Sequence, residues 1–258
     1  MIKSKWSILT GACAIALGTM WAVPASAQEA VKAKAPMYSY VSNWQIPRAH
    51  WAEMKTPAAE KEMMDKAVAD GRLVGYGSDQ NMIHTPDGWT HDDWFSSMSQ
   101  GGLYSVLKQL YTSSTSTTPV LESATKHWDL ALMSRYYGWT SGSYKDGFVS
   151  VSEYKLKKNA PEDALNSISS EVVAPLLEKM LADGTIVEYE IDTMAVHTEA
   201  PGTFMIVTVS KNAAALDKMD DAIRAAIKAN PIEGIAFDAL TDSSAHRDEI
   251  GLGDGVFK

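Results

Sequence analysis

Two short segments carry the residue types best suited to chemistry, THDDWF at residues 90–95 and KHWD at residues 126–129. A histidine beside a carboxylate can exchange protons, because the carboxylate orients the imidazole and supports its charged form. Two histidines and a carboxylate also make up a common set of metal ligands. A structural hydrogen bond between the two side chains is the third interpretation. The residue types therefore favour a site in this half of the chain without deciding its chemistry.

The candidate catalytic residues come from these segments and from the arginine that follows the second one: His91, Asp93, His127 and Arg135. Aromatic side chains concentrate in the same half, since all six tryptophans after residue 27 lie before residue 140. Aromatic faces bind apolar and cationic molecules. No residue is assigned to a metal ion, and the sequence identifies no cofactor. The candidate ligand-binding residues are Trp44, Trp89, Trp94, Trp128 and Tyr136.

The N-terminus has the pattern of a secretory signal peptide. Lys3 and Lys5 precede a mostly apolar stretch over residues 8–23, and the small residues Ala25 and Ala27 form a cleavage pattern. Polar residues, glycines and a proline interrupt the stretch, which disfavours a membrane anchor. We therefore expect cleavage after Ala27, a periplasmic or secreted mature chain, and no membrane association after cleavage.

Composition narrows the classes of partner. The chain has 258 residues, 45% of them hydrophobic, and a formal net charge of -9, which becomes -11 once residues 1–27 are removed. Such a chain can bury a core, and its acidic balance argues against nucleic acid as a partner. The single cysteine, Cys13, belongs to the predicted signal peptide. We therefore expect neither a disulfide nor thiolate chemistry in the mature protein.

An internal duplication organises the rest of the chain. Residues 63–85 and 176–198 align at a constant offset of 113 positions, with nine identical pairs in 23. Unrelated segments of this length share about one or two residues by chance. The expected organisation is a signal peptide at 1–27, a linker at 28–36, a first repeat at 37–140 and a second repeat at 141–258.

The first repeat shows the element order β-α-β-β-α-β. In its third strand, alternation places His91 and Asp93 on one face and Asp92 and Trp94 on the other. The expected strands cover 38–46, 72–78, 89–97 and 128–136, and the expected helices cover 101–111 and the segment from a Thr56 cap, with Pro57 as the first helical residue, to Gly71.

The second repeat has the same order. Pro175 predicts a kink or a break in its first helix, and Gly184 predicts a left-handed cap after it. The expected strands cover 148–154, 185–192, 203–209 and 235–240, and the expected helices cover 162–182 and the segment from Leu216 to Ile227. This order is that of a ferredoxin-like unit, whose two helices cover one face of an antiparallel sheet.

Helices on one face leave the other face of each sheet apolar, so the two repeats should cover each other. This arrangement resembles the dimeric α+β-barrel superfamily, in which two ferredoxin-like units form one barrel. The resemblance implies an α+β fold with two fused units forming a pseudo-dimeric barrel. Its members include small monooxygenases, stress-responsive barrel proteins and heme-containing chlorite dismutases, whose catalytic motifs are not recognisable here, so no residue role is carried over. The segments THDDWF and KHWD also resemble a group of uncharacterised exported bacterial proteins.

We therefore predict an exported protein that binds, and in one version also acts on, a small apolar or aromatic molecule in a Trp- and His-rich pocket of the first repeat. The alternative is a non-catalytic interaction or oligomerisation protein that uses the same aromatic surface. A second copy of the chain is then the candidate partner. The sequence does not decide between an enzyme and a binding protein.

Overall fold

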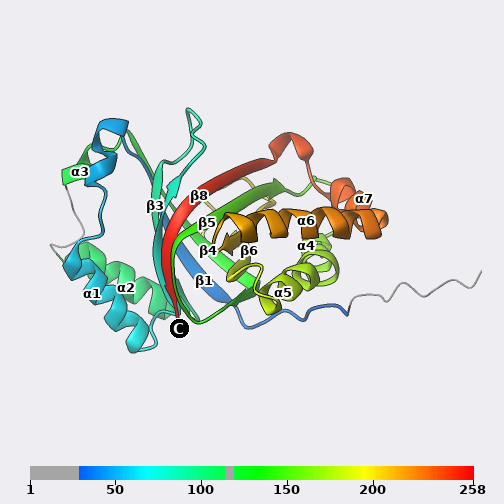
Figure 1. The fold of residues 1–258 in the computed structure, drawn as a ribbon, viewed down its shortest axis with the longest axis horizontal. Helices are drawn as coiled ribbons and strands as arrows, with labels where there is room; N and C mark the ends of the chain where they lie inside the picture. Colours follow the sequence, from blue (N-terminus) through cyan, green and yellow to red (C-terminus); the bar gives the residue numbers. More distant parts are fainter. Residues whose placement is uncertain (1–28, 114–118) are drawn as a thin grey trace, which may run out of the picture.

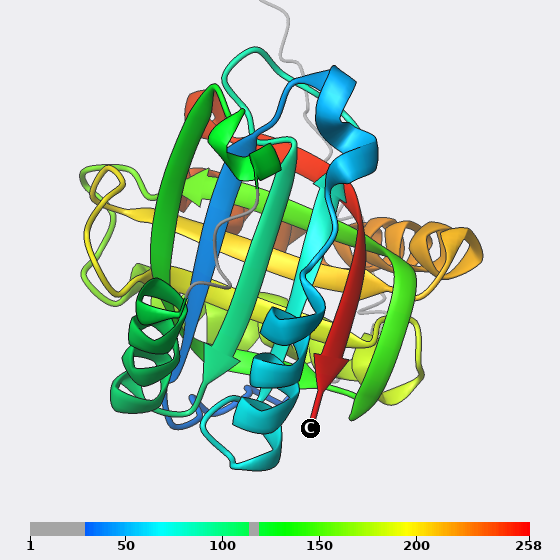
Figure 2. The same cartoon turned by 90° about the vertical axis from the view of Figure 1, so that its left-hand side faces the viewer.

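The computed structural model describes residues 29–113 and 119–258. The predicted signal peptide lies outside the described residues. In the described part of the chain, eight strands close into one barrel and the helices lie on its outside (Figures 1 and 2).

The first half of the barrel is a ferredoxin-like unit. Its two long helices follow the first and third strands, as predicted. The strands are β1 (Met37–Gln45), β2 (Gly75–Asn81), β3 (His91–Ser97) and β4 (Lys126–Trp139), the helices are α1 (Ala58–Ala69) and α2 (Gln100–Thr112), and two short helical turns are η1 (Arg48–Glu53) and α3 (Pro119–Glu122).

The second half repeats this order with more helical segments. The first helical region is divided into three consecutive pieces. The strands are β5 (Gly142–Lys155), β6 (Glu188–Met194), β7 (Thr203–Ser210) and β8 (Arg247–Phe257), and the helical segments are α4 (Ala164–Ile168), η2 (Ser169–Val173), α5 (Ala174–Ala182), α6 (Ala213–Ala229), α7 (Pro231–Leu240) and η3 (Ser243–Ala245).

Strand order confirms two ferredoxin-like units fused into one barrel. Around the barrel the strands run β1-β3-β2-β8-β5-β7-β6-β4, so β2 meets β8 and β4 meets β6 at the two junctions between units. Val74 and Val187 mark equivalent points of the duplication. The Val74 N–H donates to the Ser96 carbonyl at 2.8 Å, and the Val187 N–H donates to the Val209 carbonyl at 2.8 Å.

Helices cover the outer face of each sheet and form two separate cores there. In the first unit, Met64, Ala67 and Val68 of α1 are buried at helical spacing against the sheet. Positive φ angles of 76° at Gly71 and 71° at Gly184 follow α1 and α5, which confirms the left-handed cap predicted after α5. No helix in the described ranges is both long enough and apolar enough to cross a membrane.

Two local predictions were wrong. Residues 235–240 belong to helix α7, and the fourth strand of the second unit is β8. The apolar residues of α7 suit a strand as well as a helix, so a short run of this kind does not distinguish the two. Helix α1 begins at Ala58 with Pro57 as its N-cap, so Thr56 lies one position too early to cap it.

Pro175 interrupts its helix as predicted. The turn η2, which directly precedes α5, is a π-helical segment. Proline has no N–H and its ring clashes with the carbonyl four residues earlier, so the helix widens over the preceding turn.

The interior of the barrel departs from the apolar face expected of two sheets that cover each other. Five buried carboxylates line it, together with apolar residues of β1, β4, β5 and β7. The five are Asp79, Asp92, Glu188, Glu190 and Asp192.

Candidate functional site

Strand β3 forms a wall between two cavities. Alternation along the strand turns Asp92 and Trp94 towards the barrel interior and His91 and Asp93 towards the outer face. This confirms the division of faces predicted from the sequence. The segment THDDWF therefore contributes to two different cavities, which we call the lumen and the outer groove.

The outer groove lies between the sheet of the first unit and the helices that cover it, and it continues over β8 and the start of β5, with a total volume of about 770 Å³. Figure 2 looks onto this face, where α1 and α2 cover one end of the strands and η1 and α3 lie near the other end. Its polar part is lined by Ser42, Trp44, Trp51, Glu60, Ser78, His91, Asp93 and His127.

Aromatic rings flank this polar part of the groove. Trp44 stacks on His127 with ring centroids 3.7 Å apart and an interplanar angle of 17°. The rings of His91 and Trp51 are nearly perpendicular, with centroids 5.6 Å apart, and the Trp51 and His84 centroids lie 4.7 Å apart. The indole Nε1 of Trp44 is buried and has no hydrogen-bond partner among the described residues. A buried N–H without an acceptor is costly, so this atom is positioned to donate to a bound molecule.

His91 and His127 line the same groove but are not neighbours on paired strands. In the strand registers Trp44 is opposite His91 on one side and opposite His127 on the other. Trp44 therefore lies between the two histidines, on the strand that separates theirs. Side chains of β3 and β4 reach one groove because β1 runs between them.

Burial controls the protonation of the groove. Burial, and then the neighbouring His84, lower the pKa of His91 to about 4, so its imidazole is neutral at neutral pH. Burial, and then the neighbouring Glu60, raise the pKa of Asp93 to about 7. A carboxyl with that pKa can both take and release a proton near neutral pH. The groove thus holds a neutral histidine beside a titratable carboxyl.

His127 takes part in a structural motif that occurs twice in the barrel. Its Nε2 lies 3.0 Å from Asp129 Oδ1 and 2.9 Å from Ser42 Oγ. A catalytic relay needs the carboxylate and the hydroxyl on different ring nitrogens, whereas here both contact the same one. The second unit repeats the pattern: His246 Nε2 lies 3.1 Å from Asp248 Oδ1, and its ring stacks on a residue of β5.

The lumen is the second cavity, with a volume of about 630 Å³. Of the predicted ligand-binding tryptophans, Trp89 and Trp128 line the lumen, Trp44 lines the outer groove, and Trp94 lines both. Trp89 donates from Nε1 to Glu249 Oε2. The structure therefore divides the predicted aromatic pocket between the two sides of the sheet.

Sequence analysis missed the lumen carboxylates as site residues. Glu188, Glu190 and Asp192 occupy alternate positions of β6, so all three point inward while Tyr189 and Ile191 pack under the helices. The alternation E-x-E-x-D was the available signal. A half-buried strand with acidic residues on one face ordinarily turns that face to solvent, so this alternation alone does not indicate a site.

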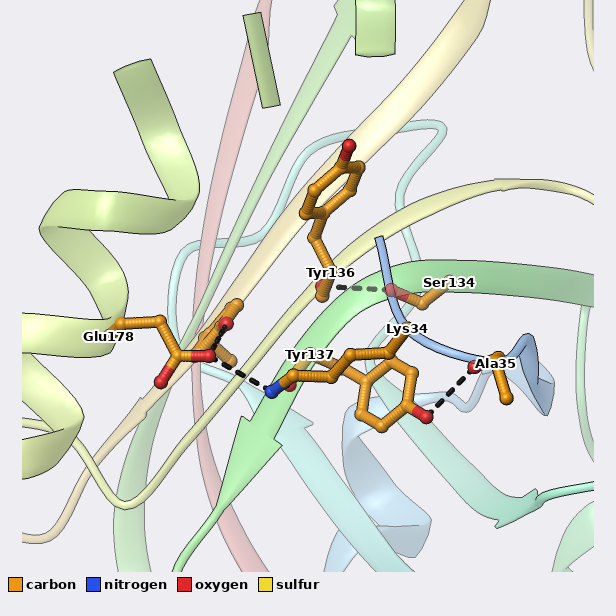
Figure 3. A network of polar contacts seen from close by, with 7 residues as sticks. Lys34, Ala35, Ser134, Tyr136, Tyr137 and Glu178 are labelled. Carbon is orange, nitrogen blue, oxygen red and sulfur yellow. Dashed lines mark hydrogen bonds and ion pairs between the residues drawn. The ribbon is translucent and has the colours of Figure 1, made fainter. Parts of the chain in front are cut away.

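Arg135 and Tyr136 lie outside both cavities. The pairing of β4 with β6 shifts between Ser134 and Tyr136, which leaves Arg135 as the extra residue of a bulge. The bulge reverses the alternation, so Tyr136 turns outward to the core of the second unit and donates to Asn166 Oδ1 at 2.7 Å. Figure 3 shows the side chains of Tyr136 and Tyr137 pointing in opposite directions.

Arg135 is exposed, and its carbonyl accepts a hydrogen bond of 2.8 Å from the Lys34 N–H. Lys34 also binds Glu178 Oε1 at 2.9 Å, and Tyr137 donates to the Ala35 carbonyl at 2.8 Å (Figure 3). The bulge thus docks the N-terminal segment onto the barrel. This contact gives Arg135 a place in the fold and no contact with either cavity.

Comparison with solved structures identifies the fold. A protein from Lactobacillus acidophilus NCFM described as a "putative monooxygenase" superposes with a TM-score of 0.58 at 12% identity, over 85% of this chain and 94% of that one. A second protein so described, from Fusobacterium nucleatum, gives a TM-score of 0.52 at 9% identity, over 87% and 94%.

A cyanide complex of a chlorite dismutase mutant from Candidatus Nitrospira defluvii superposes less well, with a TM-score of 0.45 at 10% identity over 84% and 90% of the two chains. No protein-family model and no curated protein matches the sequence. The chain therefore has the dimeric α+β-barrel fold, as the resemblance predicted, and at these identities the comparison extends to the fold alone.

Proposed function

We propose that this chain is an exported protein that binds a small aromatic molecule in the outer groove and exchanges a proton with it through Asp93. The observation that carries the proposal is the groove of about 770 Å³ in which stacked aromatic rings flank a titratable carboxyl. This volume lies within the range typical of small-molecule sites. Export rests on the predicted signal peptide.

The chemistry of the groove indicates what the ligand carries. The unpartnered Nε1 of Trp44 can only donate, so it suits a hydroxyl or carbonyl oxygen on the ligand. The faces of Trp44 and Trp51 suit an aromatic ring. Asp93, with its pKa near 7, suits a group that loses a proton near neutral pH. A phenolic compound combines these three features.

The fold comparison suggests the reaction to test first. The two proteins reported above with TM-scores of 0.58 and 0.52 are each described as a "putative monooxygenase". The first activity to assay is therefore oxidation of a phenolic compound by molecular oxygen, with Asp93 taking the phenolic proton. One oxygen atom of O2 becomes the second carbonyl of the quinone product, and the other leaves as water with the phenolic hydrogen and the ring hydrogen that the new carbonyl replaces. Neutral His91 is a second hydrogen-bonding group within the same groove.

An interaction protein that uses the aromatic surface is the competing function. The observation against it is that each of the six tryptophans after residue 27 is buried or half-buried within its own chain. Side chains in that position line cavities and contribute little to a docking surface. The burial of the tryptophans therefore favours a ligand site.

The test is a titration of phenolic compounds into the purified mature protein, followed by tryptophan fluorescence and melting temperature. Trp44→Phe keeps an aromatic ring and removes the N–H donor. Asp93→Asn keeps the shape of the side chain and removes the ionisable carboxyl. We expect each variant to weaken binding at least about tenfold, which corresponds to about 1.4 kcal/mol. Asp217→Asn, an exposed change on α6, is the matched control. Binding that is equal in all three variants would refute the groove as the site.

A further inference from the structure

The lumen has the composition of a site for cations. Four of its five buried carboxylates have a side-chain oxygen that is buried and lacks a hydrogen-bond partner among the described residues: Asp79 Oδ1, Asp92 Oδ1, Glu188 Oε1 and Asp192 Oδ1. The exposed fraction of these four residues lies between 1% and 7%. An unsatisfied buried acceptor is costly, and several in one cavity indicate an absent donor.

Among residues 29–113 and 119–258, no basic side chain reaches the deeper part of the lumen lining. The basic residues in the lining are Lys126 and Arg247. Each is the first residue of its strand, so both lie at the mouth of the lumen. Lys126 is paired with Asp87 at 2.6 Å. The carboxylates deeper in the barrel therefore face one another without a basic partner, which is unfavourable for buried charges of one sign.

The carboxylates form two groups on opposite units. Asp79 and Asp92 are directly opposite each other on β2 and β3, and the other three alternate along β6. One lumen contact bridges the units: Ser39 on β1 donates to Glu190 Oε2 at 3.1 Å. The two groups thus line one continuous cavity from different sides.

Their spacing suits an extended cation better than a single ion. Within the described ranges, no three histidine, cysteine, aspartate or glutamate side chains come together closely enough to hold a metal ion. Apolar side chains, including Leu130, Leu132 and Val207, lie in the same lining. Ammonium groups would satisfy the separated carboxylates, and a methylene chain between them would contact the apolar wall.

The cavity has one acidic end and one aromatic end. Glu249, near the start of β8, lines it with Asp87 and Glu199. At the far end of β8, Phe257 stacks against Trp94 with ring centroids 5.3 Å apart, and Trp139 stacks on Phe257 at 5.8 Å. An acidic entrance raises the local concentration of cations, and an aromatic end can hold a cation against a ring face.

We propose that the lumen binds a linear aliphatic diamine or polyamine, whose ammonium groups donate hydrogen bonds to the carboxylates of the two units. This site and the outer groove lie on opposite faces of the sheet, and the two linings share Asp79, Asp92, Trp94 and Tyr144. Each proposal has its own test, because Trp44 lines only the outer groove and Glu190 and Asp192 line only the lumen.

The experiment titrates putrescine and spermidine into the purified mature protein at physiological salt, followed by calorimetry and by tryptophan fluorescence. The expected result is saturable binding at one site. Butylamine, with a single ammonium group, and magnesium ion are the comparison ligands, and each should bind at least tenfold more weakly than putrescine. Equal binding of butylamine or magnesium would overturn the proposal, as would the absence of diamine binding.

The matched variants locate the site. Asp79→Asn/Asp192→Asn keeps the shape of the lumen and removes one ionisable carboxyl from each group, and it should weaken putrescine binding at least tenfold. Asp217→Asn/Asp221→Asn removes the same number of carboxyls from the exposed face of α6 and should leave binding unchanged. If the double lumen variant does not fold, the single variants Asp79→Asn and Glu190→Gln replace it. Equal affinity in lumen and surface variants would overturn the site.

A groove variant separates this proposal from the phenolic site. Trp44→Phe should bind putrescine as the unchanged protein does, because Trp44 lines the outer groove and not the lumen. A loss of putrescine binding in Trp44→Phe together with unchanged binding in the double lumen variant would assign the amine to the groove and refute the lumen site.

Discussion

Asp92 and Asp93 are adjacent in the chain and face opposite sides of the barrel wall. Asp92 lines the lumen, opposite Asp79 in the strand register, and Asp93 lines the outer groove, opposite Ser42. Burial raises the pKa of both carboxyls. One dipeptide therefore places ionisable groups on both faces of the barrel wall, and the two groups interact: burial first, and then the neighbouring charges of Asp79 and Asp93, raise the pKa of Asp92.

Stability should depend on pH through the lumen. Burial raises the pKa of Asp79 to about 8 and that of Glu190 to about 7, whereas an unfolded carboxyl titrates near 4. The folded state then holds more protons than the unfolded state, so the free energy of unfolding falls as pH rises through these values. We expect urea denaturation to give a lower unfolding free energy at pH 8.5 than at pH 6.5.

One variant isolates the contribution of the lumen carboxyls. Asp79→Asn/Asp192→Asn should reduce the pH dependence between pH 6.5 and pH 8.5 and should be more stable than the unchanged protein at the upper pH. The remaining dependence comes from groups such as Glu190 and Asp93, whose pKa values are both raised to about 7. Below about pH 6.5 His91 has the opposite effect on the free energy of unfolding, which rises with pH there, because the lowered pKa of His91 disfavours its protonation in the folded state. A free energy of unfolding that rises between pH 6.5 and pH 8.5 would contradict the prediction.

The close approach of the Asp79 side chain requires a glycine at position 253. A Cβ added at this position would lie 1.8 Å from Asp79 Oδ1 and 2.9 Å from Val149 Cγ2. Gly253→Ala should therefore destabilise the protein by about 2 kcal/mol or more, since packed interiors resist added volume. Gly101→Ala is the control, because nothing lies within 4 Å of its Cβ. Thermal denaturation that gives the two variants equal melting temperatures would show that the lumen is not packed as described.

Tyr136 should affect stability and not ligand binding. Tyr136→Phe removes its hydrogen bond to Asn166 and leaves the ring in the core of the second unit, at a cost of about 1 kcal/mol. Binding of phenolic compounds and of putrescine should be unchanged. Loss of either ligand in this variant, with its fold intact, would restore Tyr136 to the site predicted from the sequence.

The mature N-terminus tests the prediction of export. Cleavage after Ala27 leaves a protein that begins at Gln28, and N-terminal sequencing of the protein from the periplasm or the medium checks it. An exported chain that still begins at Met1 would contradict this prediction. Retention of the whole product in the cytoplasm would contradict export itself.

Local patterns in the sequence determined much of the fold. The repeat at residues 63–85 and 176–198 established the duplication, and period-two and helical spacing identified seven of the eight strands. The same alternation assigned His91 and Asp92 to opposite faces of β3. These features depend on residues near one another in the chain, which is why the sequence alone could reveal them.

Only the tertiary structure decided which residues share a cavity. Tyr136 points away from both cavities because a bulge at Arg135 reverses the alternation of side chains along β4. Such a bulge depends on how β4 pairs with β6. The acidic face of β6 becomes an interior because the sheet closes into a barrel, joining it to Asp79 and Asp92 of the other unit. Closure depends on contacts between strands far apart in sequence, and strand periodicity does not say whether a polar face meets water or a lumen.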